Sequence, residues 1–305
     1  MIRVGQVRLL WGAVLSLLLV FPAKSADLEL VGREMVRMLQ NGHYAGLPLN
    51  EKLSARFLER YLTELDEDRL YFLQSEVTSF RRRYERSLHD LISTKQAMPA
   101  ARDIFGRYRQ RVLERATFSR KYLEAGDFSL EAERRILKDR SQAEWAMDAV
   151  ALGKLWRETV DAMVLAEKLR RHRLRGRASE LGQPDPFRKA LSVEAKVLKV
   201  FDRLERTVVG VTGEEIANRF FSAIAQSYDP HSDYLSGNEM ARFRIDVSNE
   251  LVGIGAQLAM NDDGETEVRS LVKSGPADRG GQLQLGDRIF AVSAANDGKW
   301  VDITF

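Results

Sequence analysis

The chain contains no cysteine and only four histidines among its 305 residues. Without cysteine there are no disulfide bonds, thiol nucleophiles or cysteine-ligated metals, so packing alone has to stabilise the fold. The histidines, which are His43, His89, His172 and His231, lie far apart and show none of the spacings typical of metal ligands. We therefore predict that the chain binds no metal and no cofactor.

Long apolar runs are equally scarce, and the longest lies at the very start. Two arginines precede an uncharged run from Leu9 to Phe21, and a proline and small residues follow it. This pattern predicts a signal peptide over residues 1–25, cleaved after Ser25 or Ala26. A retained anchor is the less favoured alternative, because a spanning helix needs about 20 apolar residues. We expect an exported protein with no stable membrane span after cleavage.

The net charge of +3 conceals an uneven distribution. From Val211 onward there are 8 Lys and Arg against 15 Asp and Glu, whereas the preceding part has 39 against 29. The basic residues are densest at 81–83 and 170–177, which makes an anionic partner surface one alternative. Acidic residues are interspersed in most of the same segments, so we favour solvated helix faces. We expect no nucleic acid as a partner of an exported protein.

From Asp27 to about Tyr228 the apolar residues recur at intervals of three and four, which predicts amphipathic helices. Their aromatic residues are interpreted as core and not as a cofactor site. A long helix is expected over Ser141–Leu174, with a break over Gly176–Pro186. Helix starts are expected at Asn50, Ser75 and Ser129, and at Thr212 with Glu215 as a capping box.

Beyond Tyr228 the sequence becomes rich in glycine and β-branched residues. The cluster that begins it, Asp229 to Asp233, contains two aspartates and a histidine, but we interpret it as a turn with capping side chains and not as a metal site. Short strands are expected over Ala256–Met260, Glu267–Val272 and Arg288–Val292. This part is predicted to be small and mostly β.

Three motifs follow one another in this part of the chain. Leu251–Ala256 (L-V-G-I-G-A) is a glycine-flanked turn whose backbone N–H groups are suited to a carboxylate. Ser274–Gly281 (S-G-P-A-D-R-G-G) predicts a short helix that starts at proline and stops at glycine. Leu285–Val292 (L-G-D-R-I-F-A-V) predicts a tight turn that leads into a strand. Each motif alone is weak, since a glycine-containing β-bulge has the same local pattern.

In this order and spacing the three motifs resemble the PDZ domain of bacterial proteases. Upstream, Asp229–Ser236 and the phrase Phe57–Leu62 are similar to the tail-specific, or carboxy-terminal processing, serine proteases. The resemblance implies a mainly α fold, with a helical amino-terminal bundle over residues 27–245. A partial, truncated and mostly β PDZ domain is expected over residues 246–305.

The resemblance further implies a periplasmic endopeptidase with a Ser-Lys dyad that grips apolar carboxy-terminal tails of its substrates. Tail-binding residues are expected at Leu251, Gly253, Ile254, Gly255 and Ala256. A periplasmic or lipoprotein adaptor is a further expected partner.

No Ser or Lys of this sequence matches the dyad motif, and the second PDZ helix is not reached, so no catalytic residue is assigned and these 305 residues are expected to be inactive. Two alternatives remain: a non-enzymatic periplasmic PDZ adaptor, and a basic helical domain that binds anionic surfaces.

Overall fold

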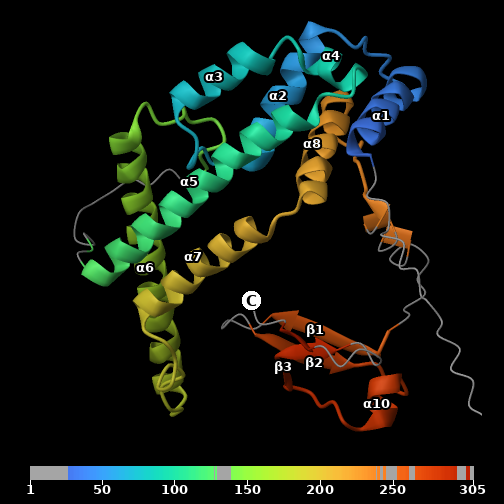
Figure 1. Cartoon of the computed structure of the whole chain (residues 1–305). Coiled ribbons are helices and arrows are strands. Elements are labelled where there is room, and N and C mark those ends of the chain that lie inside the picture. The colour runs from blue at the N-terminus through green and yellow to red at the C-terminus, as the bar shows by residue number, and fades with distance from the viewer. Residues whose placement is uncertain are drawn as a thin grey trace, which may run out of the picture.

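The computed structural model describes residues 27–126, 128, 139–237, 239–240, 243–244, 253–260, 265–293 and 300–302 (Figure 1). The helices are α1 (Leu28–Gly42), α2 (Glu51–Leu65), α3 (Gln74–Tyr84), α4 (Leu88–Ser93), α5 (Met98–Ala125), α6 (Ala149–Glu180), α7 (Val193–Gly210), α8 (Gly213–Tyr228) and α10 (Pro276–Gly280). The strands are β1 (Ala256–Met260), β2 (Thr266–Leu271), β3 (Arg288–Ile289), β4 (Ala291–Ser293) and β5 (Trp300–Asp302). The mainly α fold with a small β part is confirmed. No helix within these described ranges has the length and apolar composition needed to cross a bilayer.

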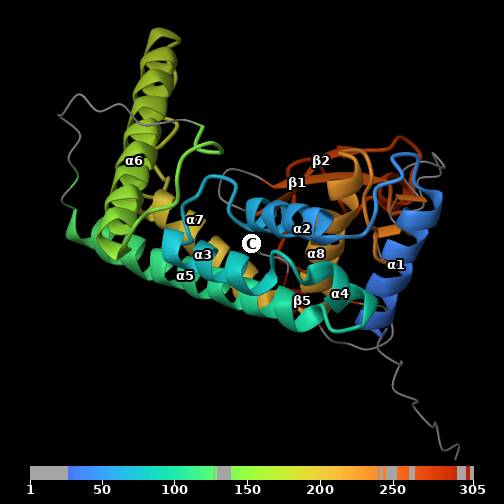
Figure 2. The same cartoon turned by 90° about the horizontal axis from the view of Figure 1, so that it is seen from above.

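The helical part is organised around α5, which packs against α6, α7 and α8 and reaches α2 (Figures 1 and 2). The largest core cluster lies between α2, α5 and α8, where the rings of Tyr61 and Phe220 meet edge to face with centroids 5.1 Å apart. Phe57 and Tyr61, which the three-and-four spacing places on one helix face, are fully buried. The interpretation of these aromatics as core is confirmed.

Two of the predicted helix starts are confirmed, and a third is wrong. The Asn50 side chain accepts a hydrogen bond from Leu53 N, and Thr212 forms a capping box with Glu215. Ser75, however, lies inside α3, which begins at Gln74 because the Glu76 carboxylate accepts from the N–H of Leu73. The start expected at Ser129 lies outside the described residues.

The long helix expected over Ser141–Leu174 is present but displaced along the sequence. It runs as α6 over Ala149–Glu180, with Asp148 as its N-cap. Before it, Ala146 O accepts from Gln74 N and Trp145 is buried in the loop, so contacts with a distant segment outweigh local helix propensity. At the other end, the helix continues through Gly176, and the break begins only at Leu181.

The loop between α2 and α3 is organised by one buried carboxylate. Asp66 is 2% exposed and accepts hydrogen bonds from the backbone N–H groups of Leu70, Tyr71 and Phe72. Its Oδ2 also accepts from the indole Nε1 of Trp145 at 3.1 Å. Burial raises the pKa of the Asp66 carboxyl, and these donors act in the opposite direction. Asp66 thus connects the α2–α3 loop to the segment before α6.

Gly32 permits the close approach of α1 to α8, which we expect a methyl group to disturb. A Cβ atom at this position would lie 2.7 Å from Cε1 of Phe221, a ring that is 1% exposed. Gly32→Ala is expected to lower the free energy of unfolding by about 1 kcal/mol, because crowding outweighs the gain in helix propensity. Gly153→Ala in α6, where a Cβ meets nothing within 4 Å, should instead raise it by about 1 kcal/mol. Urea unfolding of both variants measures this difference, and equal effects would contradict it.

The β part contains a three-stranded antiparallel sheet with the order β1-β2-β3 and a separate pair formed by β4 and β5. The strand expected over Ala256–Met260 is confirmed as β1. The strand expected over Arg288–Val292 is wrong as a single element, because β3 and β4 belong to different sheets. The helix expected after Ser274 is confirmed as α10, with Pro276 in its first turn and Gly281 at φ +63° as its C-cap.

Candidate functional site

The candidate site is the loop that leads into β1. Gly253, Ile254 and Gly255 form a bend, and Ala256 is the first residue of the strand. The structure therefore places four of the five predicted tail-binding residues together. The fifth, Leu251, lies outside the described residues.

The loop is held against the start of α10 by its own carbonyl groups. Val272 N donates to Gly255 O at 2.7 Å, and Ala277 N donates to Ile254 O at 2.7 Å. Gly255 has φ +75°, and a Cβ there would lie 3.2 Å from Cα of Gly275. Glycine is needed at position 255 for both reasons, since a left-handed backbone and a close approach each disfavour a side chain.

The backbone donors of the loop, in contrast, are unpaired within the described part of the chain. Within the described residues, the amide N–H groups of Gly253, Ile254 and Gly255 have no hydrogen-bond acceptor. Successive unpaired amides in a glycine-containing bend suit an anionic oxygen acceptor such as a carboxylate. The loop therefore offers backbone donors of the kind that an anion requires, and tail binding there stays a prediction.

The adjoining strand also has one side without a partner strand among the described residues. β1 pairs with β2 on one side, and in the three-stranded sheet it lies at the edge. Ile254, Leu258, Met260 and Val272 are exposed by 53%, 41%, 50% and 53%. An edge strand beside apolar side chains is the surface on which an extended apolar peptide can add as a further strand.

The turn after α8 contains a second polar cluster. Asp229 Oδ1 accepts from His231 N at 2.9 Å, and Oδ2 accepts from the Ser232 hydroxyl at 2.7 Å. The His231 amide, followed by the Ser232 hydroxyl, lowers the pKa of Asp229 to about 2. The prediction of a turn with capping side chains is confirmed. No group of three potential metal ligands occurs in the part of the chain that the structure describes.

The structure adds His43, from the end of α1, to this turn. Its Nε2 lies 3.3 Å from Asp229 Oδ2 and 3.2 Å from Ser232 Oγ, so serine, histidine and aspartate meet. Sequence reasoning missed His43 because it lies 186 residues from Asp229, and no local pattern connects them.

The hydrogen bonds of this cluster do not fit a catalytic triad. His43 Nδ1 accepts from Ala45 N at 3.1 Å, so in the neutral ring the proton is on Nε2, which faces both other side chains. A general base needs a free nitrogen lone pair directed at the serine hydroxyl, and that hydroxyl already donates to Asp229. We interpret the cluster as a set of side-chain hydrogen bonds that holds the end of α1 against the end of α8.

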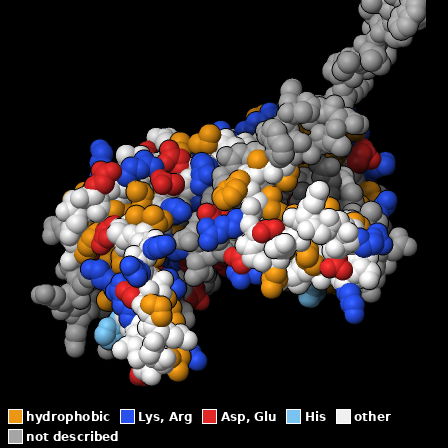
Figure 3. Space-filling view, turned by 90° about the horizontal axis from the view of Figure 1, so that it is seen from below, with side chains coloured by type: hydrophobic (Ala, Val, Ile, Leu, Met, Phe, Trp, Pro, Cys, Tyr) orange, Lys and Arg blue, Asp and Glu red, His pale blue; other side chains and the backbone are white. Residues whose placement is uncertain are grey.

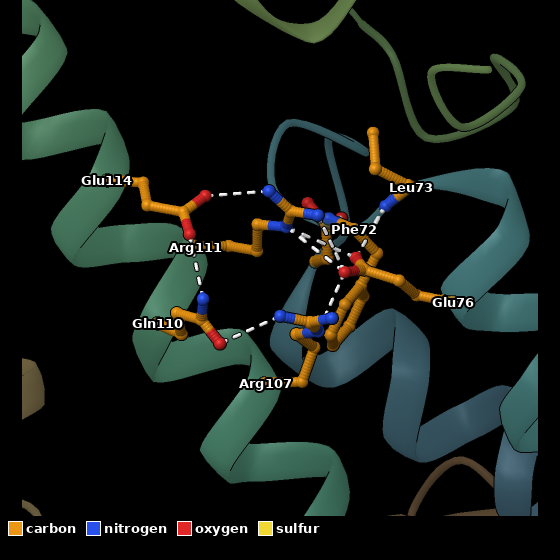
Figure 4. A network of polar contacts seen from close by, with 8 residues as sticks. Phe72, Leu73, Glu76, Arg107, Gln110, Arg111 and Glu114 are labelled. Carbon is orange, nitrogen blue, oxygen red and sulfur yellow. Dashed lines mark hydrogen bonds and ion pairs between the residues drawn. The ribbon is translucent and has the colours of Figure 1, made fainter. Parts of the chain in front are cut away.

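A polar groove of about 630 Å³ lies between α3 and α5. Figure 4 shows Arg107 and Arg111 converging from α5 on Glu76 of α3. Both guanidinium groups lie 2.7 Å from Glu76 Oε1, and Arg111 also lies 2.6 Å from Glu114. The side chain of Glu76 is only 8% exposed. Because these cations are already paired with carboxylates, the network stabilises the contact between α3 and α5 and does not suit an apolar peptide.

Comparison with known proteins identifies the family of the helical part. The family model described as the tail specific protease N-terminal domain matches residues 35–238. The tail-specific protease of Haemophilus influenzae (strain ATCC 51907 / DSM 11121 / KW20 / Rd) is 27% identical over 274 residues, which cover 90% of this chain. The chain spans 37% of the length of that protein. Since the family model covers more than half of its residues, the chain belongs to the tail-specific protease family, of which it contains the amino-terminal region.

Proposed function

We propose that this chain is the substrate-recognising portion of an exported carboxy-terminal processing serine endopeptidase. In this proposal residues 1–25 direct export to the periplasm, residues 27–245 form the helical domain, and residues 246–305 form a PDZ unit. The unit binds an apolar carboxy-terminal tail of a substrate protein. The 305 residues bind and do not cleave, since none of their Ser and Lys residues matches the dyad motif.

The observation that supports tail binding best is the set of amides at positions 253–255 that have no acceptor among the described residues, beside a strand at the edge of the three-stranded sheet. A terminal carboxylate would accept hydrogen bonds from these amides, and its chain would extend along β1. Hydrogen bonds to a charged group stabilise a complex by about 1.5–3 kcal/mol each. Ile254 and Leu258 would contact the apolar side chains of the tail, because both are exposed next to the loop.

Calorimetric titration with a peptide that ends in small apolar residues tests the proposal. The chain from Asp27 onward is expected to bind the free-acid peptide at least about tenfold more tightly than its amidated twin, because the amide removes the charge. Equal affinities would contradict carboxylate recognition, and the absence of binding would contradict tail binding altogether. Peptide cleavage by these residues would contradict the binding-only role.

A further inference from the structure

The outer half of α6 extends beyond the rest of the helical part (Figures 1 and 2). α6 has 32 residues, which corresponds to a length of about 48 Å. Leu152, Trp156, Val160 and Val164 are buried on its first half, whereas beyond Glu167 only Arg171 and Ala178 are buried. We call residues 165–192, which comprise this outer half and the loop that returns to α7, the arm.

The arm is strongly basic. It contains eight Lys and Arg and three Asp and Glu, a net charge of +5. Glu167 pairs with Arg170 and Arg171, and Asp185 pairs with Arg175. The remaining cations near the tip, which are Arg173, Arg177, Arg188 and Lys189, are exposed and have no acidic partner among the residues that the structure describes.

The return loop is held to the helix by an aromatic contact. The Phe187 ring lies under three guanidinium groups, those of Arg170, Arg171 and Arg175, with distances of 5.3, 5.1 and 5.6 Å to the ring centroid. Arg171 Nη1 also donates to Leu191 O at 2.8 Å. These contacts hold the return loop against α6 and position three of the eight cations of the arm.

Exposed leucines alternate with the cations. Leu169 is exposed by 52%, Leu174 by 40% and Leu181 by 63%. Leu169 and Leu174 are five residues apart and point in directions that differ by roughly 140° around the helix. In Figure 3, basic and apolar side chains are interspersed on the projecting arm at the lower left. A rigid protein groove contacts only one side of a helix, so leucines on several sides do not suit it. They suit a deformable surface that can contact the tip from several sides.

We propose that the arm binds the surface of membranes that contain anionic phospholipids. The unpaired arginines and Lys189 would contact lipid phosphates, and Leu181 and its neighbours would enter the boundary between headgroups and acyl chains. Interfacial protein segments combine Lys and Arg with leucine in this way. The charge of +5 complements an anionic leaflet, where each basic residue near the surface contributes a factor of about five in affinity.

Vesicle co-sedimentation tests this proposal with the chain from Asp27 onward, so that the apolar leader cannot itself insert. We expect binding to vesicles of phosphatidylglycerol and phosphatidylethanolamine, weakened by salt, and little binding to phosphatidylcholine alone. The double variant Arg173→Gln/Arg177→Gln should bind about 25-fold more weakly. Leu181→Ser should weaken binding about fivefold.

The matched control is Arg82→Gln/Arg102→Gln, which removes the same charge from exposed arginines of α3 and α5. It should change binding less than about twofold, because these residues lie outside the arm. If the control and the arm variant lose binding equally, or if neutral vesicles bind equally well, the proposal is overturned. Concentration-dependent self-association in light scattering that only the arm variant abolishes, without vesicle binding, would assign the arm to a second copy instead.

Discussion

Replacing Asp66 by alanine is expected to lower the free energy of unfolding by about 3 kcal/mol. The substitution leaves three backbone amides and the Trp145 indole N–H without their acceptor in a site that is 2% exposed. Unpaired buried donors retain their full desolvation cost, and here the loop between α2 and α3 loses its contact with the segment before α6. Guanidinium unfolding followed by tryptophan fluorescence measures the change, provided that the denaturant slope is unaltered.

Asp148→Ala is the matched control for this measurement. Asp148 also accepts a backbone hydrogen bond, from Ala151 N at 2.8 Å, but it is exposed and caps only one helix. Its loss should cost about 1 kcal/mol, the usual contribution of an N-cap. If Asp66→Ala costs no more than Asp148→Ala, the buried carboxylate does not organise the loop, and its donors must find other acceptors.

Gly255→Ala is expected to weaken binding of the free-acid tail peptide by at least about tenfold. The added methyl group has to occupy a left-handed backbone position and would lie 3.2 Å from Cα of Gly275 and 3.3 Å from Cδ of Pro276. The loop must then move away from α10 and loses the geometry of its amides. Calorimetric titration with the free-acid and amidated peptides measures the effect.

Gly281→Ala separates backbone strain from crowding. Gly281 has φ +63°, close to the value at Gly255, but a Cβ there meets nothing within 4 Å. Both variants pay the left-handed penalty, of about 1–2 kcal/mol in stability, whereas only Gly255→Ala displaces the loop. Gly281→Ala should therefore change tail affinity less than about twofold. Retained affinity in Gly255→Ala would show that the tail carboxylate binds elsewhere.

The helices could be predicted from the sequence because their signals are local. The stripe that includes Phe57 and Tyr61 indicated α2, and Asn50 marked its start, since a cap and an apolar face act within a few residues of one another. The site could be located for the same reason. Glycines at 253 and 255 predict a bend from backbone preference alone, whereas tail binding at this bend stays a prediction that depends on the order of the three motifs.

Two of the predictions failed because a distant partner competes with local propensity. The segment before α6 has helical spacing. It nevertheless forms a loop, because the indole of Trp145 donates a hydrogen bond to Asp66, 79 residues away. Residues 288–293 form two strands rather than one, because β3 pairs with β2 and Ala291 starts a pair with β5. Neither choice of partner has a signal within the segment itself.

The sequence by itself determined the helical class, several of the helix starts and the bend that forms the candidate site, because backbone preference and side-chain periodicity act over short distances. Only the tertiary structure decided which groups meet. It brought His43 to Asp229, buried Asp66 under four donors, paired some arginines of the arm and left others exposed. These outcomes depend on chain segments that are far apart in sequence, and their energies arise only when packing removes water from between them.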